Sequence, residues 1–308
     1  MPSQHDAPLR PEDPRKIGPY ALTGRLGEGG QGVVYLAEDR EGRAVAVKVL
    51  KGGPIASPKA RGRFIKEAGA ASRVEAPQVA RVLDAKVTAE RPYLVSEYVR
   101  GRTLQEEVAE SGPLKGPELH KIALRCAVGL AAIHRAQVVH RDLKPGNVVL
   151  GPRGAKIIDF GVARFLDGRT PQTTHPLGTP AYMSPEQVED LHIGPESDVF
   201  AWGATVVYAA TGRPPFGAGP TAAVMRRITD REPELGALRG NLRGLVVRCL
   251  DKEPAARPTA PEIVRFLRAE ARPAAPAARP KSVPRYRSRM IIALVVVSTL
   301  GFVCGMLF

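Results

Sequence analysis

The run HRDLKPGN at residues 140–147, followed by Asp159 at the start of a D-F-G tripeptide, constrains this chain more than any other feature. Asp142 and Asn147 stand in the spacing H-R-D-x-x-x-x-N. Carboxylate and amide oxygens in this order suit a metal-bound phosphate beside a hydroxyl group. Lys144 adds a cation where negative charge builds up on a transferring group. Two tripeptides in this order and at this spacing favour a phosphoryl-transfer site over coincidence.

A glycine-rich segment precedes this run. Gly27, Gly29 and Gly32, followed by Val34, fit G-x-G-x-x-G-x-V between two strand-like runs at residues 20–26 and 33–38. The pattern predicts a hairpin whose glycines let backbone N–H groups approach phosphates. A dinucleotide-binding turn would need a helix directly after the glycines, and the β-rich run that follows excludes it.

The run Val-Ala-Val-Lys that ends at Lys48 has the alternation of a strand. At this distance from a glycine-rich hairpin, we expect Lys48 to reach the phosphates of a nucleotide. Glu67 falls in a helical stretch at residues 59–73, on one face with Phe64, Ala68 and Ala71. An ion pair with Lys48 is the favoured interpretation of Glu67, and a solvated acid on a basic helix is the alternative.

With these motifs in order, the chain resembles the eukaryotic-type serine/threonine protein kinases, most closely their bacterial members, over residues 17–270. The resemblance implies an α+β, bilobal fold: an N-terminal lobe with a five-stranded antiparallel sheet and one helix, then a mostly helical lobe. It also implies transfer of the γ-phosphate of ATP to serine or threonine hydroxyls of proteins, as a non-specific serine/threonine protein kinase. Mg²⁺ is the expected metal ion, with Mn²⁺ as the alternative.

The resemblance carries roles to matching residues. Asp142 is the expected catalytic base and Lys144 the phosphate-stabilising cation, with Asn147 and Asp159 as metal ligands and Lys48 with Glu67 as the activating ion pair. Thr179 belongs to the substrate platform, and with Lys144 it favours serine or threonine over tyrosine. The expected ATP contacts are Leu26, Gly27, Gly29, Gly32, Val34, Ala46, Lys48, Glu97 and Val99. From composition alone, residues 93–99 would be predicted only to form a buried strand.

Three further matches are structural. The stretch Ser-Pro-Glu at residues 184–186 replaces the usual A-P-E, and its Glu186 is expected to pair with Arg257. Asp198 resembles the buried aspartate that braces the catalytic loop.

Thr170, Thr173 and Thr174 lie in the activation segment, residues 162–184, where autophosphorylation would add charge for Arg141 to pair with. The alternative is that these threonines are ordinary loop residues.

Composition fits one two-lobed domain: 308 residues, 44% hydrophobic. Its three cysteines show no paired or metal-ligand spacing, and Cys126 is expected to be a buried thiol. The net charge of +14 could suggest nucleic acid. Much of the excess lies in the C-terminal linker and no recognition fold accompanies it, so nucleic acid is not an expected partner.

The two ends are expected to be separate elements. Residues 1–16 are polar and Pro-rich and predict a flexible lead, and residues 271–289 predict a basic Ala/Pro/Arg-rich linker. Residues 290–308 carry no charge and are long enough for a transmembrane helix, with a helix packed on the domain as the alternative. Basic residues before this segment predict a single-pass cell-membrane protein with a cytoplasmic kinase domain, membrane lipid as a partner and a homodimer left open.

The motifs disfavour two other classes of protein. A pseudokinase normally loses the strand lysine or one of the two aspartates, and Lys48, Asp142 and Asp159 are all present. A small-molecule kinase tends to lack a protein-substrate platform, and residues 178–186 carry one.

Overall fold

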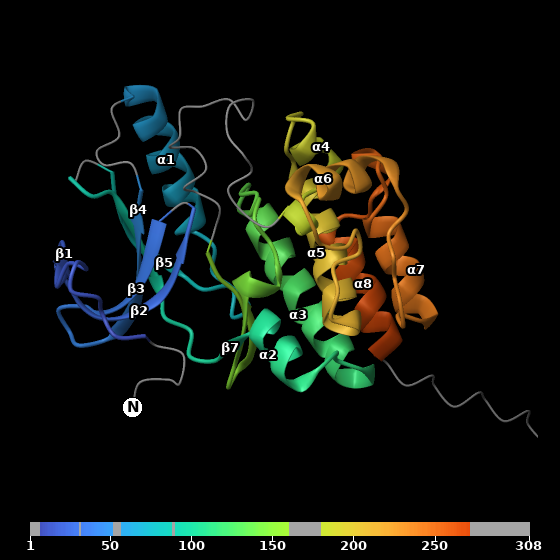
Figure 1. The fold of residues 1–308 in the computed structure, drawn as a ribbon, viewed down its shortest axis with the longest axis horizontal. Helices are drawn as coiled ribbons and strands as arrows, with labels where there is room; N and C mark the ends of the chain where they lie inside the picture. Colours follow the sequence, from blue (N-terminus) through green and yellow to red (C-terminus); the bar gives the residue numbers. More distant parts are fainter. Residues whose placement is uncertain (1–6, 31, 52–56, 88–89, 160–179, 272–308) are drawn as a thin grey trace, which may run out of the picture. The chain divides into compact units, whose positions relative to one another are not determined.

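The computed structural model describes residues 7–30, 32–51, 57–87, 90–159 and 180–271 (Figure 1). The compact unit of the fold ends at Ala271, and residues 272–308 lie outside the described residues. The expected linker and membrane segment therefore fall outside the described part of the chain. In the described part, no helix is both long and apolar enough to cross a bilayer.

The N-terminal lobe is one antiparallel sheet of six strands in the order β1-β2-β3-β4-β6-β5, with the helix α1 (Figure 1). The strands are β1 (Lys16–Ile17), β2 (Tyr20–Gly29), β3 (Gly32–Glu38), β4 (Ala44–Leu50), β5 (Val82–Lys86) and β6 (Tyr93–Glu97). The sheet has one strand more than the expected five. Gly18, with φ at 55°, turns the chain so that the two-residue β1 pairs back onto β2.

Helix α1 (Pro58–Ala71) begins where Ser57 accepts a hydrogen bond from the backbone of Ala60 and a proline occupies the first turn. Its buried face contains Phe64, Ala68 and Ala71, as the spacing predicts. Glu67 lies beside this face and is half-buried. The helix therefore holds its carboxylate at the edge of the lobe's core.

The second lobe is mostly helical. Its helices are α2 (Leu104–Ser111), α3 (Gly116–Arg135), α4 (Pro185–Val188), α5 (Pro195–Thr211), α6 (Thr221–Asp230), α7 (Gly240–Cys249) and α8 (Ala260–Ala271). A small antiparallel sheet joins β7 (Arg102–Thr103), β8 (Val148–Gly151) and β9 (Gly154–Ile157). Short 3₁₀ turns cover Pro145–Asn147, Pro180–Tyr182 and Pro254–Ala256.

Helix α5 is the centre of this lobe and is apolar nearly all round, which is typical of a helix enclosed by others. It lies between α3 and α7 (Figure 1). Trp202 is fully buried, and its indole N–H donates to the carbonyl of Ala123 on α3 at 3.0 Å. The buried charged residue Asp198 lies at the start of the same helix.

The N-terminal segment, defined as residues 7–15, differs from the flexible lead expected for residues 1–16. Ala7 exchanges two backbone hydrogen bonds with Arg25 of β2, and the side chain of Asp13 is buried against that strand. A polar, Pro-rich composition indicates the absence of regular structure. It does not indicate that one acid, Asp13, is buried and paired with a residue of another element, Arg25.

Candidate active site

One cavity of about 530 Å³ gathers most of the expected functional residues. It lies where β2, β3, β4 and β6 face the start of β8 and the loop before it, and its volume suits a small-molecule ligand. Its lining includes all nine expected ATP contacts together with Asp142, Lys144, Asn147 and Asp159. A larger hollow of about 910 Å³ contains none of these last four residues, so size alone does not identify the site.

The glycine-rich hairpin forms one wall of the cavity. Gly27 pairs with Val34 and Gly29 with Gly32 across the hairpin. A Cβ atom at Gly32 would lie 2.0 Å from the backbone oxygen of Val49, so no other residue fits there without moving β4. All three glycines line the cavity, so no side chain of theirs stands between their backbone and its interior.

Lys48 of β4 reaches into the cavity, and its Nζ lies 2.8 Å from both carboxylate oxygens of Asp159. The expected ion pair between Lys48 and Glu67 is absent from the described residues, where Glu67 makes no ion pair and does not line the cavity. The two carboxylates come from separate elements. Sequence spacing cannot show which of them packing brings closer to the ammonium.

The loop before β8 brings three of the expected residues together. Lys144 Nζ lies 2.8 Å from Oδ2 of Asp142. The amide nitrogen of Asn147 donates to the backbone oxygen of Asp142 at 2.7 Å and to its Oδ2 at 3.1 Å. Both amide hydrogens of Asn147 are thereby used, which leaves its Oδ1 as the atom available to a cation.

Asp198 of α5 braces this loop, as its position in the sequence predicted. Its Oδ2 accepts from the backbone N–H of His140 and its Oδ1 from that of Arg141, both at 2.8 Å. Nε2 of His134 lies 2.8 Å from Oδ2. Arg141 and Asp159 both have φ near 60°, a region that non-glycine residues seldom occupy. The backbone at Arg141 is therefore strained, and the hydrogen bond from its amide to the buried Asp198 carboxylate stabilises that conformation.

The tautomer of His140 follows from its partners. The backbone N–H of Asp142 donates to Nδ1, so Nδ1 carries no proton. Nε2 then carries the hydrogen and donates to the carbonyl of Ile158 at 3.1 Å. His140 is fully buried and connects the loop around Asp142 with the residue before Asp159.

Comparison with known proteins agrees with this geometry. The family model described as protein kinase domain matches residues 20–266. The chain belongs to the protein kinase family. It is 45% identical over 261 residues to the probable serine/threonine-protein kinase PkwA of Thermomonospora curvata, and 42% identical over 253 residues to the serine/threonine-protein kinase AfsK of Streptomyces coelicolor. Within the family it therefore groups with the bacterial kinases of the eukaryotic type.

These alignments cover 84% and 81% of the chain but only 35% and 32% of the two relatives. A third relative, the serine/threonine-protein kinase PkaB of Streptomyces coelicolor, is 38% identical over 267 residues, which is 82% of the chain and 64% of that protein. The chain thus spans about a third of the length of the first two relatives.

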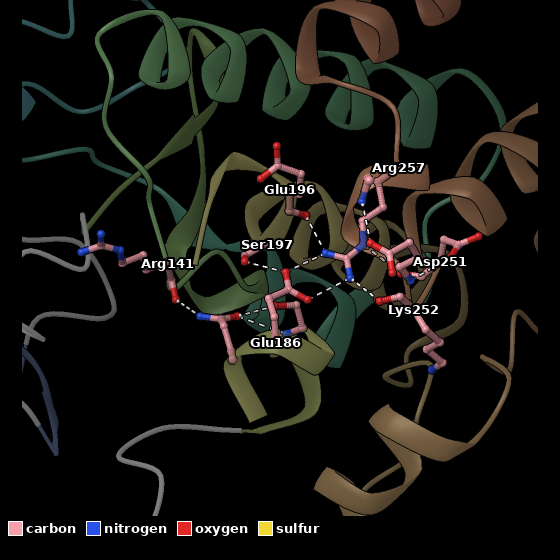
Figure 2. Close-up of polar contacts among 11 residues, drawn as sticks. Arg141, Glu186, Glu196, Ser197, Asp251, Lys252 and Arg257 are labelled. Carbon is pink, nitrogen blue, oxygen red and sulfur yellow. Dashed lines mark hydrogen bonds and ion pairs between the residues drawn. The ribbon is translucent and has the colours of Figure 1, made fainter. Parts of the chain in front are cut away.

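The expected ion pair between Glu186 and Arg257 is confirmed, at 2.7 and 2.9 Å (Figure 2). The Arg257 side chain is fully buried, and its remaining N–H groups donate to the backbone carbonyls of Glu196, Asp251 and Lys252. Burial raises the pKa of Glu186, but hydrogen bonds from Arg257 and Ser197 outweigh burial and lower it. The pair joins α4 to the stretch between the 3₁₀ turn Pro254–Ala256 and α8.

Sequence reasoning missed several apolar residues that line the cavity, which are Val82, Leu94, Val149 and Ile158. Val149 could have been found, because it belongs to the apolar run that directly follows Asn147 in the sequence. The expected substrate-platform residue Thr179 and the expected phosphorylation sites Thr170, Thr173 and Thr174 lie outside the described residues. Cys126 is buried as expected, and burial raises its pKa to about 12.

Proposed function

We propose that this chain transfers the γ-phosphate of ATP to serine or threonine hydroxyls of proteins. The observation that carries the proposal is the meeting of Lys48, Asp142, Asn147 and Asp159 around one cavity roofed by a glycine-rich hairpin. The names of the relatives support protein substrates and the choice of serine or threonine.

The family implies ATP with a divalent metal ion, and the donor set of the site fits one. The carboxylate of Asp159 and the amide oxygen of Asn147 are hard oxygen ligands, which Mg²⁺ prefers, and Mn²⁺ accepts the same set. When bound, the ion neutralises charge on the phosphates. Lys48 would turn from Asp159 towards the phosphates when nucleotide enters, because its ammonium lies within the same cavity.

The chain's own groups can then perform the transfer. Asp142 orients the substrate hydroxyl and takes its proton, while a bond forms between that oxygen and the γ-phosphorus. The bond from the γ-phosphorus to the bridging oxygen of ATP breaks, and ADP leaves with that electron pair. Lys144, which holds Asp142 at 2.8 Å, faces the charge that spreads over the transferring group.

The test is the variant Asp142→Asn in the full chain. It should bind ATP nearly as well as the wild type, because Asp142 acts on the hydroxyl and not on the nucleotide. Transfer to a generic protein substrate should fall by about 10³-fold or more, since orientation and proton removal are both lost. Lys48→Ala should abolish transfer by weakening phosphate binding. Self-phosphorylation at the wild-type rate in either variant would contradict these roles.

Autophosphorylation and membrane anchoring are also proposals. Thr173 and Thr174 are proposed sites of autophosphorylation, which mass spectrometry of the active enzyme would test. Residues 290–308 are proposed to anchor the kinase to the cell membrane, with the kinase domain in the cytoplasm, and homodimerisation is a route by which signals could arrive. Release of the full-length chain by carbonate extraction of membranes, identical to that of residues 1–280, would contradict the anchor.

A further inference from the structure

The N-terminal segment contacts the strand that leads into the glycine-rich hairpin. The backbone of Ala7 donates to Arg25 at 3.1 Å and accepts from it at 2.7 Å, as one antiparallel bridge on β2. Arg25 directly precedes Leu26, the first of the cavity-lining residues of β2. The segment therefore fixes β2 at the last position before the chain enters the site.

A buried acid links the segment to Arg25. Asp13 and Arg25 are each 8% exposed, and a guanidinium nitrogen of Arg25 lies 3.2 Å from Oδ1 of Asp13. The hydroxyl of Tyr35 donates to the same oxygen at 2.6 Å, and the backbone of Arg10 donates to Oδ2 at 2.8 Å. The hydrogen bond from Tyr35 lowers the pKa of Asp13, so the carboxylate stays ionised.

The other end of Arg25 holds the hairpin itself. Its second terminal nitrogen donates to Oε2 of Glu28 at 2.6 Å. Glu28 stands between Gly27 and Gly29 and lines the cavity. Lys51 also contacts this carboxylate, at 3.3 Å, and Arg10 lies 3.7 Å from it. The strand is bulged between Arg25 and Gly27, so backbone pairing alone does not fix the hairpin there.

We propose that Asp13 and Arg25 are positioning residues for nucleotide binding, which hold the glycine-rich hairpin over the cavity through Glu28. A hairpin with this many glycines has many conformations open to it, and closing it over phosphates costs conformational entropy. Arg25 is fixed at one end by the buried Asp13 and bonds at the other end to Glu28 of the hairpin. This link restricts the hairpin before ATP binds and so removes part of the entropy cost. The inference rests on the proposed use of ATP.

The first test compares Asp13→Asn with Asp39→Asn in the full chain. Asp39 is a matched control, because it is also an aspartate of the N-terminal lobe that binds an arginine, Arg43 at 2.7 Å, and it lies outside the cavity. Asp13→Asn should raise the Kd for ATP with Mg²⁺, measured by calorimetry, by about 5- to 20-fold, the lower range for coupling between sites. Asp39→Asn should leave the Kd unchanged. The kcat should stay within about two-fold for both variants, since no group at the reacting atoms is altered.

The second test repeats Asp13→Asn in a chain that carries Glu28→Gln. If Arg25 transmits the effect to the hairpin through Glu28, the substitution at Asp13 should change the Kd for ATP by less than about two-fold in this background. An equal effect of Asp13→Asn in both backgrounds would overturn the proposal, because it would act through general stability. No effect in the wild-type background would overturn it as well.

Hydrogen exchange separates this inference from the proposed function. The amides of Gly27 and Gly29 should exchange faster in Asp13→Asn than in Asp39→Asn without any nucleotide, and equal exchange would count against the proposal. A chain that binds ATP but transfers no phosphate would refute the kinase activity, while the Kd comparison would still decide the role of Asp13. A wild-type chain that binds no ATP would refute both.

Discussion

The buried pair of Glu186 and Arg257 should be a strong single contribution to the stability of the helical lobe. Replacing Arg257 with methionine leaves the Glu186 carboxylate, only 4% exposed, without its countercharge. It also removes donors from the backbone carbonyls of Glu196, Asp251 and Lys252. Removing one partner of a buried ion pair costs about 3–5 kcal/mol, because a buried charge is left uncompensated. Two of the three carbonyls belong to exposed residues, Glu196 and Asp251, so we do not expect the cost to exceed this range.

The fluorescence of Trp202 gives a direct assay. It is the only tryptophan of the chain and lies fully buried against α3. Urea unfolding of Arg257→Met should show a free energy of unfolding lower by about 3–5 kcal/mol. At about 2–4 °C per kcal/mol for a domain of this size, Tm should fall by roughly 6–20 °C.

Two controls make the reasoning refutable. Arg226→Met removes an exposed ion pair with Asp230, and it should change the free energy of unfolding by less than about 1 kcal/mol. The double variant Glu186→Met with Arg257→Met should be more stable than Arg257→Met alone, because it leaves no buried charge. A single variant as stable as the wild type, or a double variant less stable than the single one, would refute the reasoning.

Three further predictions concern the same lobe and its loop. The pKa of Glu186 is lowered in the folded protein, so its stabilising contribution is present above the unfolded pKa, near 4.5. That contribution is lost as pH falls through the lower folded value. The difference in the free energy of unfolding between the wild type and Glu186→Gln should therefore shrink below about pH 4.5 in urea titrations. Gly129→Ala would place a methyl group 2.9 Å from Ile157 Cδ1 and 3.2 Å from the Gln78 carbonyl, so it should destabilise the domain by about 1–3 kcal/mol in the same assay. Asp198→Asn turns an amide N–H₂ towards a backbone N–H of His140 or Arg141, and kcat should fall by about 10- to 100-fold while the Kd for ATP is kept.

Much of the site could be predicted because its polar residues lie close together in short motifs of fixed order. Asp142, Lys144 and Asn147 lie within six residues, so the local backbone of the loop brings them together wherever the loop is placed. The hairpin of β2 and β3 follows from glycines between two β-rich runs. Here local sequence and final structure agree, which is typical of natural folds.

The failures occur where partners come from distant elements. Lys48 could pair with Glu67 of α1 or with Asp159 far along the chain, and only packing decides between them. Asp13 looked like one polar residue in a Pro-rich lead, yet its partners Arg25 and Tyr35 lie 12 and 22 residues away. Neither contact has a local signal, because no periodicity or capping pattern joins residues so far apart in the sequence.

The position of Asp142 is best understood from the helix beneath it. Arg141 adopts a left-handed backbone conformation that costs a non-glycine residue about 1–3 kcal/mol and persists only where surrounding structure enforces it. Asp198 enforces it by accepting both the His140 and Arg141 amides with a carboxylate that is only 1% exposed. Asp198 is held in turn by α5, the most enclosed helix of the lobe. The loop around Asp142 thus takes its geometry from the rigid core, and a residue outside the cavity sets where the proposed base lies.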